Sequence, residues 1–266
     1  MKGGYFLFNG QFHKEGDAVF TLADLSQRAL GFSEIFRAEH NEILFPHAIS
    51  AHLFATAENA GLEISGTIGP EGRLLQKDVS RLLNKNKFYL AARIGIQFYR
   101  SGDKINCILT AEEIERGYYP YYEPGLLLSF YDIQTAGSFS FQNSPLLAGE
   151  QNKPDLIIIN SSGFTCRSLF CSIAYIEKDQ VFFTTESSVR NKCAILEEIF
   201  KSAKDVGLEP MEKENVTPEM LLEADEVFLF DTCNGIQKVL GLEDRRYFSP
   251  KTKLIAKRLA ERAKKG

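Results

Sequence analysis

The sequence lacks several patterns that would assign it to a common class of protein. No stretch of 18 consecutive apolar residues is present, so no segment is predicted to cross a membrane as a helix. The four histidines show no metal-binding spacing, and no metal site is predicted. A P-loop, a G-x-G-x-x-G motif and a G-x-S-x-G motif are all missing. The sequence therefore does not show the marks of a P-loop nucleotide-binding protein, a dinucleotide-dependent enzyme or a serine hydrolase.

Disulfide and signal-peptide patterns are also missing. The five cysteines are an odd number and include no C-x-x-C pair, which is typical of reduced thiols. The first five residues lack the apolar core of a signal peptide. We therefore expect a cytoplasmic protein. A net charge of −4 and a pI of about 5.7 argue against nucleic acid or an anionic membrane surface as the main partner.

The first half of the sequence reads as a mixture of strands and helices. Asn9-Gly10 is the strongest hairpin signal, because both residues tolerate the left-handed backbone of a two-residue turn. Apolar residues recur at helical spacing from His47 to Gly61, and alternation predicts a long strand from Phe88 to Tyr99. Shorter predicted elements are strands at 29–36, 42–45 and 106–109, a polar turn at 39–41, and a helix at 78–83.

The second half is richer in strands. Thr217-Pro218-Glu219 has the features of a helix start, with a threonine cap followed by proline. The predicted strands are 126–131, 155–160, 172–176, 181–184 and 226–230, and the predicted longer helices are 189–206 and 250–265. A charged and tyrosine-rich stretch separates the halves. We therefore predict an α+β protein with an N-terminal domain at 1–115, a linker at 116–125 and a C-terminal, barrel-like domain at 126–266.

One segment is similar to a known family signature. Residues Leu222 to Val239, with Ala224-Asp225-Glu226-Val227-Phe228-Leu229 followed by a turn at Thr232, resemble the C-terminal signature of class IV aminotransferases and aminodeoxychorismate lyases. Further matches occur in the same order along nearly the whole chain. They are Tyr5 to Gly10, Asp24 to Arg37 (with Asp24, Gly31, Glu34 and Arg37 retained), His47 to Leu62, Arg93 to Arg100, Asp155 to Gly163, and Val189-Arg190.

The resemblance implies a two-domain pyridoxal-phosphate fold of type IV, usually a homodimer. It also implies a lysine that holds the cofactor covalently and moves protons, and a glutamate that keeps the pyridine nitrogen protonated. An arginine on the first long helix, backbone amides at a helix start and a late threonine are implied to bind the phosphate.

At several of these positions the chain departs from the family. Gln142 stands at the lysine position, and an amide nitrogen is not nucleophilic. The only lysine between Lys104 and Lys178 is Lys153, which leaves it as a displaced substitute or as a solvated loop lysine. Arg167 stands where the glutamate is expected, either facing the pyridine or paired elsewhere. At the position of the phosphate-binding arginine the sequence has His52 in one register and Ser50 in another, and no arginine occurs between Arg37 and Arg73.

The loops that line the family site also differ. Only 12 residues lie between Gln142 and Asp155, which is too few for the long helix that the family has there. The stretch from Thr184 to Arg190 is shorter than in the family. The retained anion-binding positions are Ser188, Val189, Arg190, Thr232 and Asn234.

Three hypotheses follow. The first is a non-catalytic type IV protein that binds no cofactor and holds another small anionic or carboxylate ligand in the former cleft. The second is an active pyridoxal-phosphate enzyme, either an aminodeoxychorismate lyase or a branched-chain or D-amino-acid aminotransferase, with a displaced lysine. The third is a role in binding a protein partner. The first two differ in whether a lysine adduct with the cofactor can be trapped.

Overall fold

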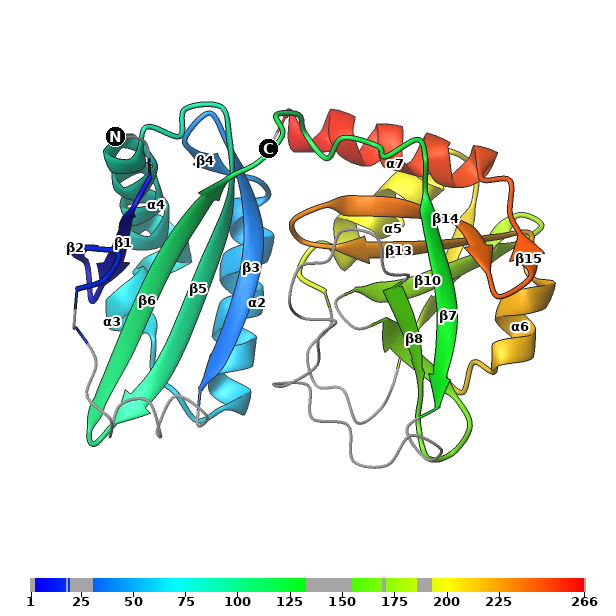
Figure 1. Cartoon of the computed structure of the whole chain (residues 1–266), viewed down its shortest axis with the longest axis horizontal. Helices are drawn as coiled ribbons and strands as arrows, with labels where there is room; N and C mark the ends of the chain where they lie inside the picture. The colour runs from blue at the N-terminus through cyan, green and yellow to red at the C-terminus, as the bar shows by residue number, and fades with distance from the viewer. Residues whose placement is uncertain are drawn as a thin grey trace. The chain divides into compact units, whose positions relative to one another are not determined.

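The computed structural model of the chain describes residues 3–17, 19, 31–132, 155–168, 171–185 and 193–265. The chain divides into two compact units. The first comprises Met1–Pro120, Cys193–Ile195 and Ala263–Gly266, and the second comprises Tyr121–Lys192 and Leu196–Arg262. Each contains a sheet with packed helices (Figure 1), so the predicted α+β class is confirmed. The exact domain boundaries given above stay a prediction.

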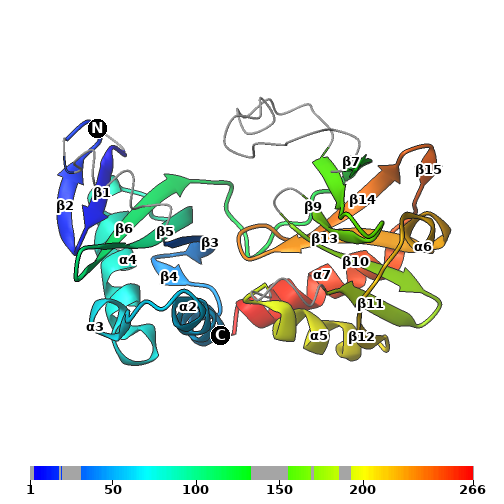
Figure 2. The ribbon, with the colours of Figure 1, turned by 90° about the horizontal axis from the view of Figure 1, so that it is seen from below.

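The first unit is built on an antiparallel sheet of six described strands in the order β2-β1-β6-β5-β3-β4. The strands are β1 (Tyr5–Phe8), β2 (Gln11–Lys14), β3 (Phe32–Glu39), β4 (Glu42–Ile43), β5 (Ala91–Ser101) and β6 (Lys104–Glu113). Helices α2 (Pro46–Asn59), α3 (Ser65–Ile68) and α4 (Arg73–Asn86), with the short 3-10 helix η2 (Pro70–Gly72), pack against this sheet (Figure 2).

Periodicity explains how this sheet and its helices meet. On β5, Ile94, Ile96 and Phe98 alternate toward the core and are at most 1% exposed. On α4 the buried residues follow helical spacing, and Val79 and Leu82 are fully buried. The two faces share one apolar cluster, which stabilises the unit through hydrophobic burial.

Two tight turns set the register of the strands. Asn9 (φ 50°) and Gly10 (φ 76°) both take the left-handed backbone, as the hairpin signal predicts. His40 (φ 51°) and Asn41 (φ 69°) form a similar turn between β3 and β4. The strand predicted at 29–36 is therefore three residues out of place, because the charged residues before this turn belong to β3.

Asn86 fastens the end of α4 to β1. Its side chain accepts a hydrogen bond from Tyr5 N (2.9 Å) and donates one to Tyr5 O (2.9 Å), and Asn86 is 1% exposed. We expect Asn86→Ala to lower the free energy of unfolding by about 2 kcal/mol, because two backbone groups lose their partner. Chemical denaturation followed by circular dichroism checks this value. Asn84→Ala, at an exposed site on the same helix, is the control and should change stability by less than about 0.5 kcal/mol; equal effects of the two changes would contradict the prediction.

The second unit contains a mixed sheet in the order β12-β11-β10-β13-β14-β7-β8-β9, with β15 paired to β14. The described strands are β7 (Leu126–Asp132), β8 (Asp155–Ile159), β9 (Thr165–Ser168), β10 (Ser172–Glu177), β11 (Gln180–Thr184), β12 (Glu209–Lys213), β13 (Glu226–Asp231), β14 (Gly235–Leu242) and β15 (Arg245–Arg246). Its helices are α5 (Leu196–Asp205), α6 (Pro218–Glu223) and α7 (Pro250–Ala263). Ser168 N at the end of β9 donates to Cys171 O before β10 (2.9 Å), so the sheet curls back toward its own centre.

Several elements of this unit differ from the sequence-based expectation, because β9, β12, β14 and β15 were not predicted as strands. The helix predicted at 189–206 begins only at Leu196 among the described residues, and 193–195 are not helical. Strand β12 was not predicted, because its sequence Glu-Pro-Met-Glu-Lys is mostly polar. It forms because it pairs in parallel with β11 at the edge of the sheet, where polar side chains can face solvent.

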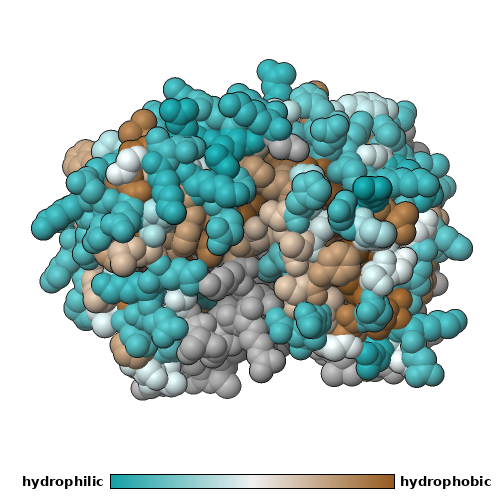
Figure 3. All heavy atoms as spheres, turned by 180° about the vertical axis from the view of Figure 1, so that it is seen from behind, coloured by the Kyte–Doolittle hydropathy of each residue, from teal (hydrophilic) through white to brown (hydrophobic). Residues whose placement is uncertain are grey.

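On the face seen in Figure 3, polar side chains are the most numerous, and apolar side chains are exposed among them. Phe248, just before α7, is the most exposed large apolar side chain of the described residues, at 88%. Over the part of the chain that the structure describes, no helix is long and apolar enough to cross a membrane.

Candidate functional site

The signature segment forms the centre of the second unit. All residues of β13 from Glu226 to Phe230 are buried, which explains their nearly continuous apolar sequence. Phe228 and Phe230 pack edge-on against the ring of Phe183, at centroid distances of 6.1 Å and 5.5 Å. Val227 and Leu229 face the opposite core. The strand is therefore held on both faces, and the turn that follows it is fixed in place.

The two acidic residues at the start of β13 have structural roles. Glu226 is 3% exposed and accepts hydrogen bonds from Lys251 N (2.9 Å), Thr252 N (2.8 Å) and Thr252 Oγ1 (2.7 Å). These donors lie in the first turn of α7, where a carboxylate is favoured by the helix dipole. Asp225 accepts from Lys178 N (2.7 Å) in the β10–β11 turn. These contacts give the signature a physical reason: it ties the central strand to a helix and a hairpin.

At the other end of β13, the Asp231 carboxylate organises the turn to β14. Its Oδ1 accepts hydrogen bonds from Cys233 N (2.7 Å) and Asn234 N (2.6 Å). Its Oδ2 accepts from Asn234 Nδ2 (2.9 Å) and Gln237 Nε2 (3.1 Å). Both oxygens are therefore held by donors of the turn and of β14.

The thiol of Cys171 completes this arrangement. Its Sγ donates to Asp231 Oδ2 at 3.3 Å, and Cys171 is 7% exposed. The Cys171 backbone N donates to Ser168 Oγ (2.9 Å), which links the cluster to the end of β9. We call Cys171, Asp231, Asn234 and Gln237 the Asp231 cluster. It collects polar groups from the start of β10, the end of β13 and the start of β14.

Three of the predicted site residues lie in or next to this region. Thr232 and Asn234 are in the β13–β14 turn, where Asn234 is a direct partner of Asp231. Arg167 is exposed on β9, and its Nε donates to Ser168 O (3.2 Å). Ser168 in turn contacts Cys171, so Arg167 is connected to the cluster through one residue. A role for any of these residues in binding stays a proposal.

His52 lies in the first unit, on α2. Its Nε2 is 3.0 Å from Oε1 of Glu34 on β3, and the two side chains are 14% and 26% exposed. The pair joins α2 to the sheet, and a phosphate contact for His52 stays a prediction. The other predicted residues, Gln142, Lys153, Ser188, Val189 and Arg190, lie outside the described residues.

The sequence analysis assigned no role in the site to Asp231, Cys171, Gln237 or Ser168. Only Asp231 carried a usable signal, because an aspartate followed by a short polar stretch and glycine favours a turn in which the carboxylate caps the backbone. The positions of Cys171 and Gln237 depend on strand pairing. They reach Asp231 from 60 and 6 residues away in the sequence.

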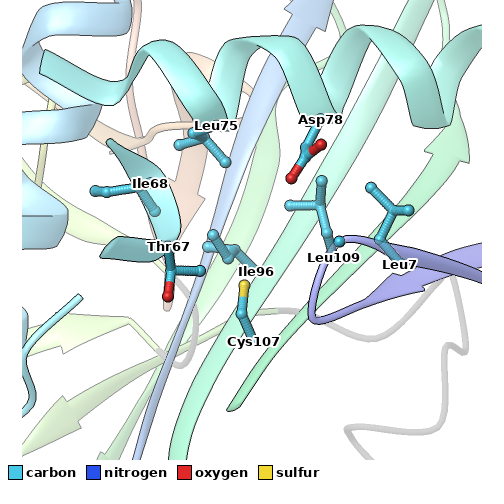
Figure 4. A pocket seen from close by; sticks show the side chains of 9 residues that line it. Leu7, Thr67, Ile68, Leu75, Asp78, Ile96, Cys107 and Leu109 are labelled. Carbon is cyan, nitrogen blue, oxygen red and sulfur yellow. The ribbon is translucent and has the colours of Figure 1, made fainter. Parts of the chain in front are cut away.

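A pocket in the first unit is too small for a ligand. It lies between α4 and the sheet, lined mainly by apolar side chains with Asp78, Thr67 and Cys107 (Figure 4). Its volume of about 20 Å³ suits a single water molecule. Burial, and secondarily the charge of Asp78, raise the pKa of the Cys107 thiol to about 12, so no reactive thiolate forms there.

Within the described residues no group of His, Cys, Asp and Glu could hold a metal ion.

Solved structures of aminotransferases share this fold. The branched-chain amino acid aminotransferase from Escherichia coli aligns with a TM-score of 0.73 and 18% identity, over 96% of this chain and 92% of that chain. A hypothetical aminotransferase from Mycobacterium tuberculosis, in its α-ketoglutarate and PMP bound form, aligns with a TM-score of 0.75 and 12% identity, over 97% of this chain and 98% of that chain. The branched-chain amino acid aminotransferase from Thermobaculum terrenum, in its PLP-form, aligns with a TM-score of 0.74 and 13% identity, over 100% of this chain and 95% of that chain. No protein-family model and no curated protein matches the chain.

The chain therefore has the type IV fold of pyridoxal-phosphate proteins, as the signature predicts. Within that class, its structure is similar to the branched-chain amino acid aminotransferases over nearly its whole length.

The expectation that no cofactor binds is wrong. It rested on departures at the lysine, glutamate and arginine positions and on two shortened loops, whereas the solved structures that share the fold include PMP-bound and PLP-bound forms. The two positions on which it depended most, Gln142 and Lys153, lie outside the described residues, and the described residues do not show a lost site. The physical reason for the error is that cofactor binding draws on many contacts, of which a covalent lysine is one.

Proposed function

We propose that this chain is a class IV aminotransferase-like protein that binds pyridoxal phosphate or its amine form without holding it covalently. Gln142 stands where the family resemblance implies the lysine, and an amide nitrogen forms no covalent bond to an aldehyde. When bound, pyridoxal phosphate supplies an electron-withdrawing ring. Without a lysine beside it, the chain lacks the proton shuttle that standard transamination needs.

The donor-lined turn after β13 is the observation that carries this proposal. It already holds a carboxylate through two backbone N–H groups and the amide side chains of Asn234 and Gln237, so its donors suit an anionic group. Thr232 lies in the same turn, and the exposed Arg167 supplies a positive charge on β9. We propose that the residues of this turn, with Ser188, Val189 and Arg190, hold the phosphate, and that Arg167 lies on the ring side of the cofactor.

Arg167 also bears on the electronics of the ring. A cation beside the pyridine nitrogen favours the unprotonated nitrogen, because a nearby like charge disfavours protonation. The unprotonated ring withdraws electrons less strongly. We therefore propose that the protein holds the cofactor, or a small carboxylate ligand in its place, with little transaminase activity.

Titration with pyridoxal phosphate tests the proposal. We expect saturable binding, seen as a change in the absorbance of the cofactor, with no adduct on a lysine after borohydride reduction and peptide mass spectrometry. An adduct on Lys153 that disappears in Lys153→Ala, but persists in the control Lys104→Ala, would establish the alternative of an active enzyme with a displaced lysine. Absence of any binding would contradict the proposal itself.

We also propose that the chain forms a homodimer, as the family resemblance implies. Light scattering coupled to size-exclusion chromatography measures this directly. We expect a mass of about twice the 29.9 kDa of one chain. A single species at the mass of one chain, over the micromolar range, would contradict it.

A further inference from the structure

The β13–β14 turn already contains an anion of its own. Five donors converge on the Asp231 carboxylate: two backbone N–H groups at Oδ1, and the side chains of Asn234, Gln237 and Cys171 at Oδ2. Converging backbone N–H groups and amide side chains are the means by which turns bind phosphate. The carboxylate therefore occupies the same kind of donors that an incoming phosphate needs.

We propose that Asp231 is a built-in competitor that sets the affinity of this turn for phosphate-bearing ligands. This inference rests on the proposed function, because it takes the turn as the place where the phosphate binds. An incoming phosphate either displaces the carboxylate from Cys233 N and Asn234 N or lies beside it. In both cases the negative charge of Asp231 opposes binding, because like charges at contact distance repel.

The competing explanation is that Asp231 only caps the backbone of the turn and has no effect on ligand binding. Replacing Asp231 by asparagine separates this structural role from the competitor role. Asp231→Asn keeps an oxygen that accepts from Cys233 N and Asn234 N, so the backbone of the turn keeps its cap. The negative charge is removed, and the side chains of Asn234, Gln237 and Cys171 lose their acceptor at Oδ2 and become available to a ligand. A structural role predicts little change in ligand affinity for this variant. A competitor role predicts tighter binding of phosphate.

Asp225→Asn is a matched control. Asp225 also caps a backbone N–H, that of Lys178, and it lies at the opposite end of β13 in the same unit. The change alters the net charge of the chain by the same amount. Any effect that comes from overall charge alone therefore appears in both variants.

The test compares the full-length protein with both variants, using isothermal titration calorimetry with inorganic phosphate and with pyridoxal phosphate at low salt. We expect Asp231→Asn to bind inorganic phosphate at least ~10-fold more tightly than the unaltered chain, equivalent to about 1.4 kcal/mol. Asp225→Asn should stay within about twofold of the unaltered chain, which is less than 0.5 kcal/mol by the same relation. The gain should shrink at high salt, because screening weakens the repulsion.

The outcomes separate this inference from the proposed function. If the unaltered chain binds pyridoxal phosphate and Asp231→Asn gains nothing over Asp225→Asn, the competitor role is wrong and the proposed function stands. If the unaltered chain binds no pyridoxal phosphate but Asp231→Asn gains phosphate binding, the competitor role stands and the proposed function is wrong. If neither variant nor the unaltered chain binds phosphate, the competitor role is wrong.

Discussion

Replacing Glu226 by alanine is expected to lower the free energy of unfolding of the second unit by about 3 kcal/mol. The change removes one buried carboxylate and leaves Lys251 N, Thr252 N and Thr252 Oγ1 without their acceptor. Hydrogen bonds to a charged group are worth about 1.5–3 kcal/mol, and unsatisfied buried groups add to the loss. The same change removes a negative charge from the start of α7, where the helix dipole favours it.

Hydrogen exchange measured by mass spectrometry checks this prediction together with chemical denaturation. In Glu226→Ala the amides in the first turn of α7 and in β13 should exchange faster than in the unaltered chain. Glu226→Gln keeps one acceptor oxygen and should lose roughly half as much stability. Glu223→Ala, at an exposed glutamate three residues earlier, is the control and should stay within about 0.5 kcal/mol. Equal losses at Glu226 and Glu223 would show that the contact with α7 contributes nothing.

The second large effect is expected at Arg37, in the first unit. Arg37 Nε and Glu39 Oε1 are 2.7 Å apart, and the side chains are 3% and 1% exposed. Arg37 also donates to the backbone oxygen of Glu115, and Gly117 N donates to Glu39 Oε1 (3.1 Å). Arg37→Met leaves the Glu39 carboxylate buried without its cation, which costs about 3–5 kcal/mol.

A double variant separates the pair from the packing around it. In Arg37→Met with Glu39→Leu, both charges are replaced by apolar groups, and most of the lost stability should return. The exposed pair Arg93–Glu112 is the control, and Arg93→Met should cost less than about 1 kcal/mol. A double variant that is no more stable than Arg37→Met alone would contradict this explanation. Denaturation followed by circular dichroism measures the free energy of unfolding of the unaltered chain, of Arg37→Met, of the double variant and of Arg93→Met.

Local sequence predicted those elements that are stabilised by their own residues. The Asn9-Gly10 hairpin forms as predicted because both turn residues adopt positive φ at low cost. The helix at Pro218 forms as predicted because Thr217 accepts from Met220 N and proline fits the first helical position. Strand β12 and the true end of β3 could not be predicted in this way, because pairing with β11 and with β5 decides them.

The candidate site was predictable only in part. The signature predicted a turn at Thr232 and Asn234, and both residues lie in the β13–β14 turn, while their role in binding stays a proposal. The Asp231 carboxylate accepts the backbone hydrogen bonds that shape that turn, but the signature gives Asp231 no role of its own. Its donors include a thiol from the start of β10, and such a contact depends on strand pairing across 60 residues.

The sequence by itself determined the type IV fold and the order and approximate bounds of most elements, since periodicity, turn residues and one signature segment act over short stretches. The tertiary structure alone decided which polar groups meet. Glu226 reaches α7 across 25 residues, Arg37 reaches Glu115 across 78, and Asp231 gathers donors from three strand ends. The physical reason is that a buried charge is stable only beside partners, and those partners are set by the packing of segments that lie far apart in the chain.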